Sequence, residues 1–185
     1  MEMKNHKRAA MEMSVGTMVT IVLLMIVLVL GIFFIQRIFS SANDALDLTD
    51  QQLTSELLKL FSNSEEKKIV IYPTTLSTEI KRGEQGGFGF LIRNKEQTNG
   101  VFSYETVLQE VASNCIMTDE EAEALLILGK SGSGINLGSG AIMDSAKRIT
   151  LEVPESSPLC TIDYLLSITK DGEPYTQASL TVKIK

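Results

Sequence analysis

The segment that most constrains this chain runs from Met13 to Gln36 and contains no charged residue. A helix rises ~1.5 Å per residue, so a helical segment of this length reaches ~36 Å, enough to cross a hydrocarbon core of ~30 Å. In lipid, a single segment satisfies its backbone hydrogen bonds only as a helix. We therefore expect a transmembrane helix over residues 13–36. The alternative, a buried helix of a soluble core, fits less well because the segment is apolar on every face.

The chain has 185 residues, and its charge is unevenly distributed. Residues 1–12 contain Lys4, Lys7 and Arg8 beside two glutamates, whereas the sequence from residue 38 onward is acidic enough to bring the net charge to −6. The positive-inside rule then places the N-terminus in the cytoplasm and the larger C-terminal part outside. That part is long enough for one domain with its own core. Its acidity excludes nucleic acid as an expected partner, since phosphate binding needs clustered Lys and Arg.

The two cysteines, Cys115 and Cys160, both lie in the expected outer domain. Outside the membrane the environment is oxidising, so we expect a disulfide between them, with two buried free thiols as the alternative. A metal centre is not expected, because the single histidine, His6, lies on the other side of the membrane.

The apolar segment could also belong to a secretory signal peptide. Such peptides have an apolar stretch of ~7–15 residues followed by a cleavage site of small residues. The run in this chain is longer, and Ser40-Ser41-Ala42 is only a weak site of that kind. We therefore expect an uncleaved single-pass anchor, with cleavage after Ala42 as the alternative.

A short basic leader, His6-Lys7-Arg8-Ala9-Ala10, ends in small residues directly before Met11-Glu-Met-Ser14 and the apolar run. It resembles the N-terminus of archaeal type IV pilins and archaellins, and the resemblance covers residues 4–60. It implies that a membrane peptidase removes the leader after Ala9 or Ala10 and that the N-terminal helix self-associates in the core of a filament. Many pilins carry glutamate at the fifth mature position, whereas Glu12 would be third or second in this chain.

Residues 37–61 follow the membrane segment with an amphipathic pattern. Apolar or small residues recur at spacings of three and four and so share one helical face: Ala42, Leu46, Thr49, Leu53, Leu57 and Leu60. No Gly or Pro interrupts residues 32–72, so we expect the membrane helix to continue as a stalk to Phe61, with any kink at Ser40-Ser41. The stripe would pack on sister subunits, pack on the chain's own β-domain, or serve as a spacer. Residues 62–68 are polar and predict a linker.

Residues 69–185 carry a β-strand pattern of about seven short, alternating segments, typical of an antiparallel sandwich. The segment from Val101 to Val111 predicts Phe102, Tyr104 and Leu108 on one side, with Val107 and Val111 on the other. Asp171-Gly172 predicts a hairpin turn before the last strand. The remaining expected strands lie near residues 69–72, 76–80, 88–92, 149–153, 160–168 and 180–184.

The opening strands of this domain carry Pro73, Ile80, Gly83 and the alternating run Phe88-x-Phe90-x-Ile92-x-Asn94. They resemble bacterial and archaeal immunoglobulin-like surface domains, and the resemblance covers residues 69–185. It implies an all-β immunoglobulin-like sandwich. The chain has no tryptophan and lacks the Tyr-x-Cys of antibody domains.

One insertion interrupts the strands. The sequence Thr118-Asp-Glu-Glu121 is a capping box and predicts a short helix over Ala122–Leu128, ended by Gly129. We expect the glycine-rich stretch from Gly129 to Gly140 to be a mobile loop. Its Gly-Lys-Ser start is not expected to bind nucleotide, because a phosphate loop needs glycine where this chain has Ala124.

The outer domain offers little for catalysis. It contains no histidine, and a cysteine nucleophile would need a base. Asp119, Glu120, Glu121 and Glu123 could supply carboxylates, but at helical spacing they are typical of a solvated, capping face. We therefore expect no enzymatic activity and no cofactor.

Together these features predict an α+β, non-enzymatic cell-surface protein with a transmembrane helix, a stalk and an outer sandwich. Three roles are compatible with them. The first is a pilin-like or envelope subunit whose N-terminal helices pair laterally, located in an extracellular filament if the leader is removed. The second is a monomeric tethered sandwich whose loops contact a surface protein or glycan. The third is an accessory subunit of a membrane complex such as a secretion or filament machine. Membrane lipid is a partner in every case.

The cysteine pairing gives a first prediction. Replacing Cys115 with Ser should lower the free energy of unfolding by ~2–5 kcal/mol, because the bridge closes a long loop in the unfolded chain. Thermal unfolding with and without reductant measures this effect. Equal melting temperatures under the two conditions would contradict the pairing.

Overall fold

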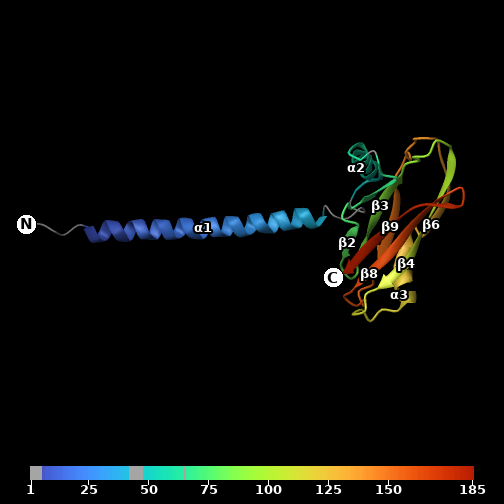
Figure 1. The fold of residues 1–185 in the computed structure, drawn as a ribbon. Helices are drawn as coiled ribbons and strands as arrows, with labels where there is room; N and C mark the ends of the chain where they lie inside the picture. The colour runs from blue at the N-terminus through green and yellow to red at the C-terminus, as the bar shows by residue number, and fades with distance from the viewer. Residues whose placement is uncertain (1–5, 42–47, 65) are drawn as a thin grey trace, which may run out of the picture. The chain divides into compact units, whose positions relative to one another are not determined.

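The computed structural model describes residues 6–41, 48–64 and 66–185, with side chains described for 16–33, 48–64 and 66–185. The chain divides into two compact units, Met1–Ala42 and Asn43–Lys185. The first contains helix α1 (His6–Ser41), and the second is an α+β unit built on two β-sheets (Figure 1). Each unit is described by itself.

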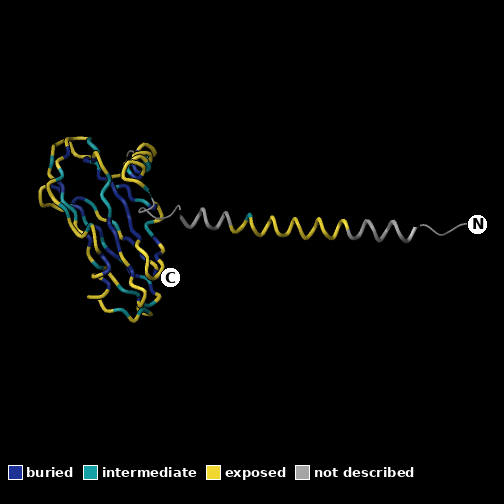
Figure 2. Tube along the Cα trace, turned by 180° about the vertical axis from the view of Figure 1, so that it is seen from behind, coloured by how far each residue is buried: buried dark blue, intermediate teal, exposed yellow. Residues whose placement is uncertain are grey.

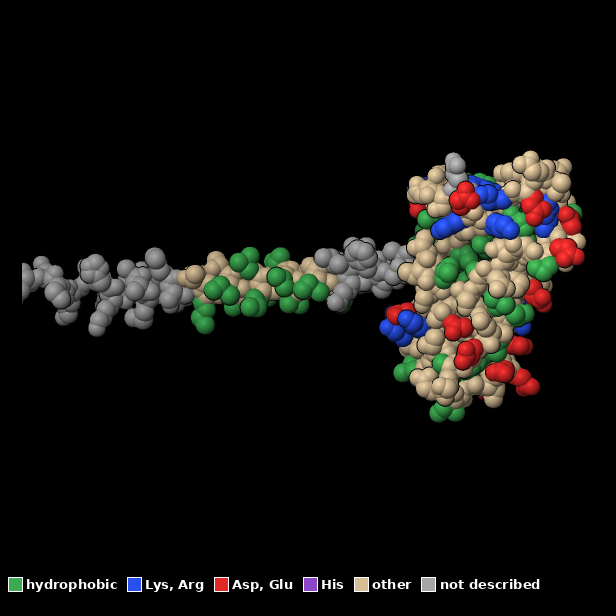
Figure 3. All heavy atoms as spheres, in the orientation of Figure 1, with side chains coloured by type: hydrophobic (Ala, Val, Ile, Leu, Met, Phe, Trp, Pro, Cys, Tyr) green, Lys and Arg blue, Asp and Glu red, His purple; other side chains and the backbone are tan. Residues whose placement is uncertain are grey.

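Helix α1 contains the segment expected to span a membrane. By length and composition, Gly16–Phe33 is apolar enough to cross one, and none of its residues is buried (Figure 2). Apolar side chains cover the visible face of this stretch of the helix in Figure 3. The backbone of Ala9 and Ala10 is helical within α1, but their side chains lie outside the described ones, so leader removal stays a prediction.

The expected continuous stalk to Phe61 is wrong. A second helix, α2 (Asp50–Ser62), begins after Thr49, whose backbone is extended with φ −65° and ψ 159°. Thr49 caps this helix: its side-chain oxygen accepts from the Gln52 backbone N–H at 3.3 Å, and the Gln52 side chain accepts from the Thr49 N–H at 3.0 Å. Because an extended capping residue cannot continue a helix, α2 starts anew. Ala42 and Leu46 of the predicted stripe lie outside the described residues.

The apolar face of α2 packs on the chain's own sheet, which settles one of the open alternatives. Leu53, Leu57 and Phe61 are buried against β1 (Ile69–Tyr72) and β3 (Gln85–Ile92). As a result β3 is buried on both faces, although its sequence alternation predicted one.

The sandwich has two sheets, and the described residues form nine strands rather than about seven. One sheet has the order β1-β3-β7-β5, with β7 at Lys147–Glu152 and β5 at Leu126–Leu128. The other has the order β2-β9-β8-β4-β6. Its strands are β2 (Ser77–Ile80), β9 (Glu173–Ile184), β8 (Thr161–Lys170), β4 (Gly100–Val111) and β6 (Ser131–Leu137). The β2–β9 pair is parallel, so the expected all-antiparallel arrangement is wrong at that edge.

The core between the sheets is built from alternating residues, as predicted for β8, where every second side chain from Ile162 to Ile168 is buried. The predicted hairpin turn is confirmed: Asp171 and Gly172 join β8 to β9 with φ values of 52° and 89°. In β4 the prediction fails at one place. A bulge between Leu108 and Glu110 shifts the alternation, so Val111 packs on the core.

The helix and loop predicted over residues 122–140 are also corrected. The helix, α3 (Asp119–Ala124), ends before residue 125, and the chain then forms β5 in one sheet and β6 in the other. Gly129 makes this crossing with φ +82°, and a side chain there would collide with the Arg148 carbonyl. The glycine-rich stretch is therefore largely an edge strand, since its backbone pairs with β4.

The docking of α2 gives a second prediction. Leu57→Ala should lower the free energy of unfolding of the chain in detergent micelles by ~2–5 kcal/mol, because it leaves a cavity at a fully buried position. Leu58→Ala, on the same helix but 40% exposed, should cost well under ~1 kcal/mol. Chemical unfolding measures both, and equal losses would contradict the docked helix.

Candidate binding groove

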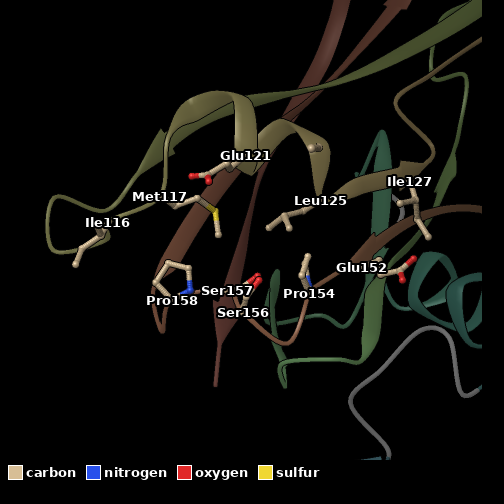
Figure 4. A pocket seen from close by; sticks show the side chains of 11 residues that line it. Ile116, Met117, Glu121, Leu125, Ile127, Glu152, Pro154, Ser156, Ser157 and Pro158 are labelled. Carbon is tan, nitrogen blue, oxygen red and sulfur yellow. The ribbon is translucent and has the colours of Figure 1, made fainter.

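A cavity of about 650 Å³ lies beside α3, at one end of the sandwich. We call it the α3 groove. In Figure 4, Met117 and Leu125 lie on one side, and Pro154, Ser157 and Pro158 lie on the other. The remaining lining residues are Ile116, Glu121, Ala124, Ile127, Glu152 and Ser156. Apolar side chains therefore dominate the walls.

Helix α3 is fixed at its N-terminus and at Ala122. The predicted capping box is confirmed: the Thr118 hydroxyl accepts from the Glu121 N–H at 3.3 Å, and the Glu121 carboxylate accepts from the Thr118 N–H at 2.9 Å. From the core below, the Tyr164 hydroxyl donates to the Ala122 carbonyl at 2.7 Å. These bonds hold one wall of the groove in place.

The disulfide holds the two walls together. Cys115 and Cys160 are bonded as predicted, with their Cα atoms 5.1 Å apart across a sequence separation of 45 residues. Cys115 directly precedes Ile116 and Met117 in one wall, and Cys160 follows Pro158 of the other. The groove is therefore pre-formed by a covalent link, which lowers the entropic cost of binding.

Carboxylates set the charge of the groove. Glu121 and Glu152 line it, and none of the lining residues is Lys or Arg. Burial raises the pKa of the Tyr164 hydroxyl above its ordinary value of 10.0, and the nearby negative charge of Glu123 raises this pKa further. The predicted acidic face of α3 thus lies beside a concave apolar surface, which the sequence analysis did not foresee.

Several apolar side chains at this end face solvent. Ile116 is 93% exposed, Leu159 is 59% exposed, and Ile127 on β5 is 50% exposed. The sequence analysis missed these residues. A usable signal was present, however: each predicted disulfide cysteine has a large apolar neighbour in a segment with no strand pattern, so the bridge predicts that the two neighbours lie close together.

The other sites considered in the sequence have structural roles. The carbonyls of Gly129 and Lys130 accept hydrogen bonds from the side chain and backbone of Thr106 at 3.0 and 2.7 Å, so this segment ties β4 to the crossing between sheets. Across the described residues, no group of His, Cys, Asp or Glu side chains is arranged to hold a metal ion.

No protein-family model matches the chain, and no curated protein matches it. Among solved structures, a family 123 glycoside hydrolase from Clostridium perfringens matches with a TM-score of 0.39 and 8% identity, over 58% of this chain and 22% of the hydrolase. The PapD-like domain 7 of human CEP192 matches with a TM-score of 0.37 and 12% identity, over 64% of this chain and 84% of that domain. Self-complemented MyfA, the major subunit of Myf fimbriae from Yersinia enterocolitica, matches with a TM-score of 0.32 and 7% identity, over 63% of this chain and 96% of MyfA. Likenesses this weak carry no inference about family or function.

The Tyr164 hydroxyl gives a third prediction. Tyr164→Phe should lower the free energy of unfolding by ~1 kcal/mol, because the Ala122 carbonyl loses the shorter of its two hydrogen bonds and keeps only that from the Leu125 N–H. In the parent protein the unfolded tyrosine releases its proton near pH 10 while the folded one keeps it, so stability should fall as pH rises through 10. Melting temperatures against pH should fall less steeply for the variant. An unchanged alkaline slope would contradict the assignment.

Proposed function

We propose that the chain is a single-pass membrane-anchored, non-enzymatic surface protein, with residues 1–12 in the cytoplasm, α1 across the bilayer and the sandwich outside. The observation that carries this proposal is the contrast between the two units. Residues 16–33 of α1 bury none of their side chains, whereas the second unit buries its own apolar residues in one core. In the functional state of a protein, lipid or other apolar helices cover an apolar helix of this kind.

In the first version of this proposal, the protein is a structural subunit whose copies associate through α1. The helix is apolar on all sides over residues 16–33, so sister helices could pack around it without exposing charge. The resemblance of residues 4–60 to archaeal type IV pilins supports a filament subunit, released for assembly after cleavage at Ala9 or Ala10. The resemblance of residues 69–185 to immunoglobulin-like surface domains supports an external location for the sandwich.

A second candidate is a tethered binding module. The α3 groove favours it, because this site is concave, apolar and held by a disulfide. The docking of α2 on its own sheet favours it too, since Leu53, Leu57 and Phe61 are no longer available to sister subunits. In this role the sandwich holds a surface protein or glycan, or joins a larger membrane complex as an accessory subunit.

Intact mass and N-terminal sequencing of protein from its native membrane separate these roles. We expect the protein to resist alkaline carbonate extraction, because α1 is retained. A start at Ala10 or Met11 favours the filament subunit, and a start at Met1 favours the tethered module. A soluble protein that starts after Ala42 would overturn the membrane anchor and make the apolar segment a signal peptide.

A further inference from the structure

We propose that a second pocket of the sandwich binds an extended, acidic segment of another protein, which adds as a strand to the free part of β9. This pocket has a volume of about 380 Å³ and is lined by residues of β1 and of the first half of β9. We call it the β1–β9 seam. It shares no lining residue with the α3 groove, and its occupation does not depend on the membrane anchor, so the proposal goes beyond the proposed function.

The free edge of β9 is the first reason. β2 pairs with β9 only over Thr181–Ile184, beside the C-terminal end of β9 (Figure 1). There the Thr181 N–H donates away from β8, to the Leu76 carbonyl at 2.8 Å. Backbone groups point to the same edge of a strand at every second residue, so those of Gln177 and Ser179 point to this edge too. Among the described strands, none pairs with them on that side. Such an edge can pair with an added segment.

The edge of β1 opens into the same pocket. β1 ends the order β1-β3-β7-β5, so it has a strand on one side only. Ile71 pairs with Phe90, whose ring centre lies 5.0 Å from that of Tyr104 in the other sheet. Side chains of directly paired residues share one face of a sheet, so Ile71 and Ile69 face the space between the sheets. Both of them line the seam, opposite Ala178 of β9. A strand added to β9 there would therefore lie in the seam.

The inner face of β9 leaves room for an added segment. Leu180, Val182 and Ile184 are buried where β2 covers the edge, whereas the next inward position along β9 is the small residue Ala178. Side chains of a strand alternate, so every second side chain of an added segment would point between Ala178 and Ile71. Apolar side chains at those positions would remove apolar surface from water.

Charge selects the kind of partner. Lys67 and Lys68 line the seam, and none of its lining residues is Asp or Glu. The Lys68 Nζ donates to the Tyr175 carbonyl of β9 at 3.1 Å, so one of these cations already spans the two edges. The neighbouring Glu66 pairs with Lys95 at 3.2 Å. A second copy docked by the same seam would bring the lysines of both copies together, whereas a segment with Asp or Glu gains attraction.

The experiment uses two synthetic octapeptides with neutral blocked ends and the same Val-Thr-Val-Thr centre. One carries two Glu at each end and the other two Lys at each end. Each is added to the full chain in nanodiscs at ~0.15 M salt. We expect saturable binding of the Glu-flanked peptide by calorimetry and none of the Lys-flanked peptide. A Glu-flanked peptide with methylated backbone nitrogens should not bind, because it cannot pair with a strand. Amide hydrogen exchange should slow at Gln177 and Ser179 on binding.

Matched variants locate the site. Lys67→Glu and Ala178→Leu should each weaken the Glu-flanked peptide at least about tenfold, the first by reversing a charge and the second by filling the seam. Lys130→Glu, with the same change of net charge at an exposed lysine, and Ala112→Leu, at another half-buried alanine, should leave binding unchanged. Lys67 is exposed, so its variant keeps the test valid if Ala178→Leu unfolds the chain.

Four results would overturn the proposal: no saturable binding of the Glu-flanked peptide, equal binding of both peptides, equal weakening by the control variants, or slowed exchange at residues other than Gln177 and Ser179. A fifth would be loss of self-association of the chain in Lys67→Glu, because a second copy would then be the occupant of the seam.

Discussion

The contact of Leu53 with Gly89 is the interaction on which the rest of the second unit depends. A side-chain carbon at residue 89 would lie 2.6 Å from the Leu53 side chain, so a larger residue there would force Leu53 to shift. Polar contacts then fix both ends of the helix. Arg148 pairs with Asp50 at 2.9 Å and donates to the Leu48 carbonyl, and the Arg93 guanidinium lies 4.4 Å from the Phe61 ring centre. The second unit therefore includes α2 as well as the two sheets.

Sequence reasoning succeeded where one local signal decides the outcome. The alternation of β8, the Asp171-Gly172 turn and the cap at Thr118 each depend on a few neighbouring residues, and the structure confirms them. Sequence reasoning failed where a contact with an element far away in the chain determines the structure. Residues 37–61 have helical periodicity throughout, and the periodicity alone could not reveal that Thr49 caps a helix whose apolar face is covered by β3.

The same reasoning explains the remaining corrections. The stretch from Gly129 to Gly140 looks mobile by composition, because glycine and serine carry little packing information. Its conformation is set by pairing with β4, a contact between residues far apart in the chain. The groove could be foreseen in part, since the disulfide was predicted, but its apolar walls come from α3, β5 and the 154–158 segment together. Only the folded topology brings these three segments to one place.

The two units differ in how their apolar surface is covered. In the sandwich, burial of a large apolar side chain contributes ~1.5–3 kcal/mol, and the core holds many of them. Helix α1 exposes a comparable set, among them Leu24 at 68% and Met25 at 67%. Leaving the whole stretch in water would cost on the order of tens of kcal/mol by the same scale. A lipid bilayer removes that cost, and so does a bundle of sister helices assembled from the bilayer. The proposal of a membrane anchor follows from this difference in free energy.

The most direct test of that account is to label intact cells with a membrane-impermeant amine reagent and map the modified lysines by mass spectrometry. Lys67, Lys130 and Lys183 are exposed on the second unit, while Lys170 is buried at 6% exposure and serves as an internal control. The account predicts modification of the three exposed lysines before lysis, with Lys170 protected. Modification of these lysines only after the cells are lysed would place the sandwich inside the membrane barrier and contradict the account.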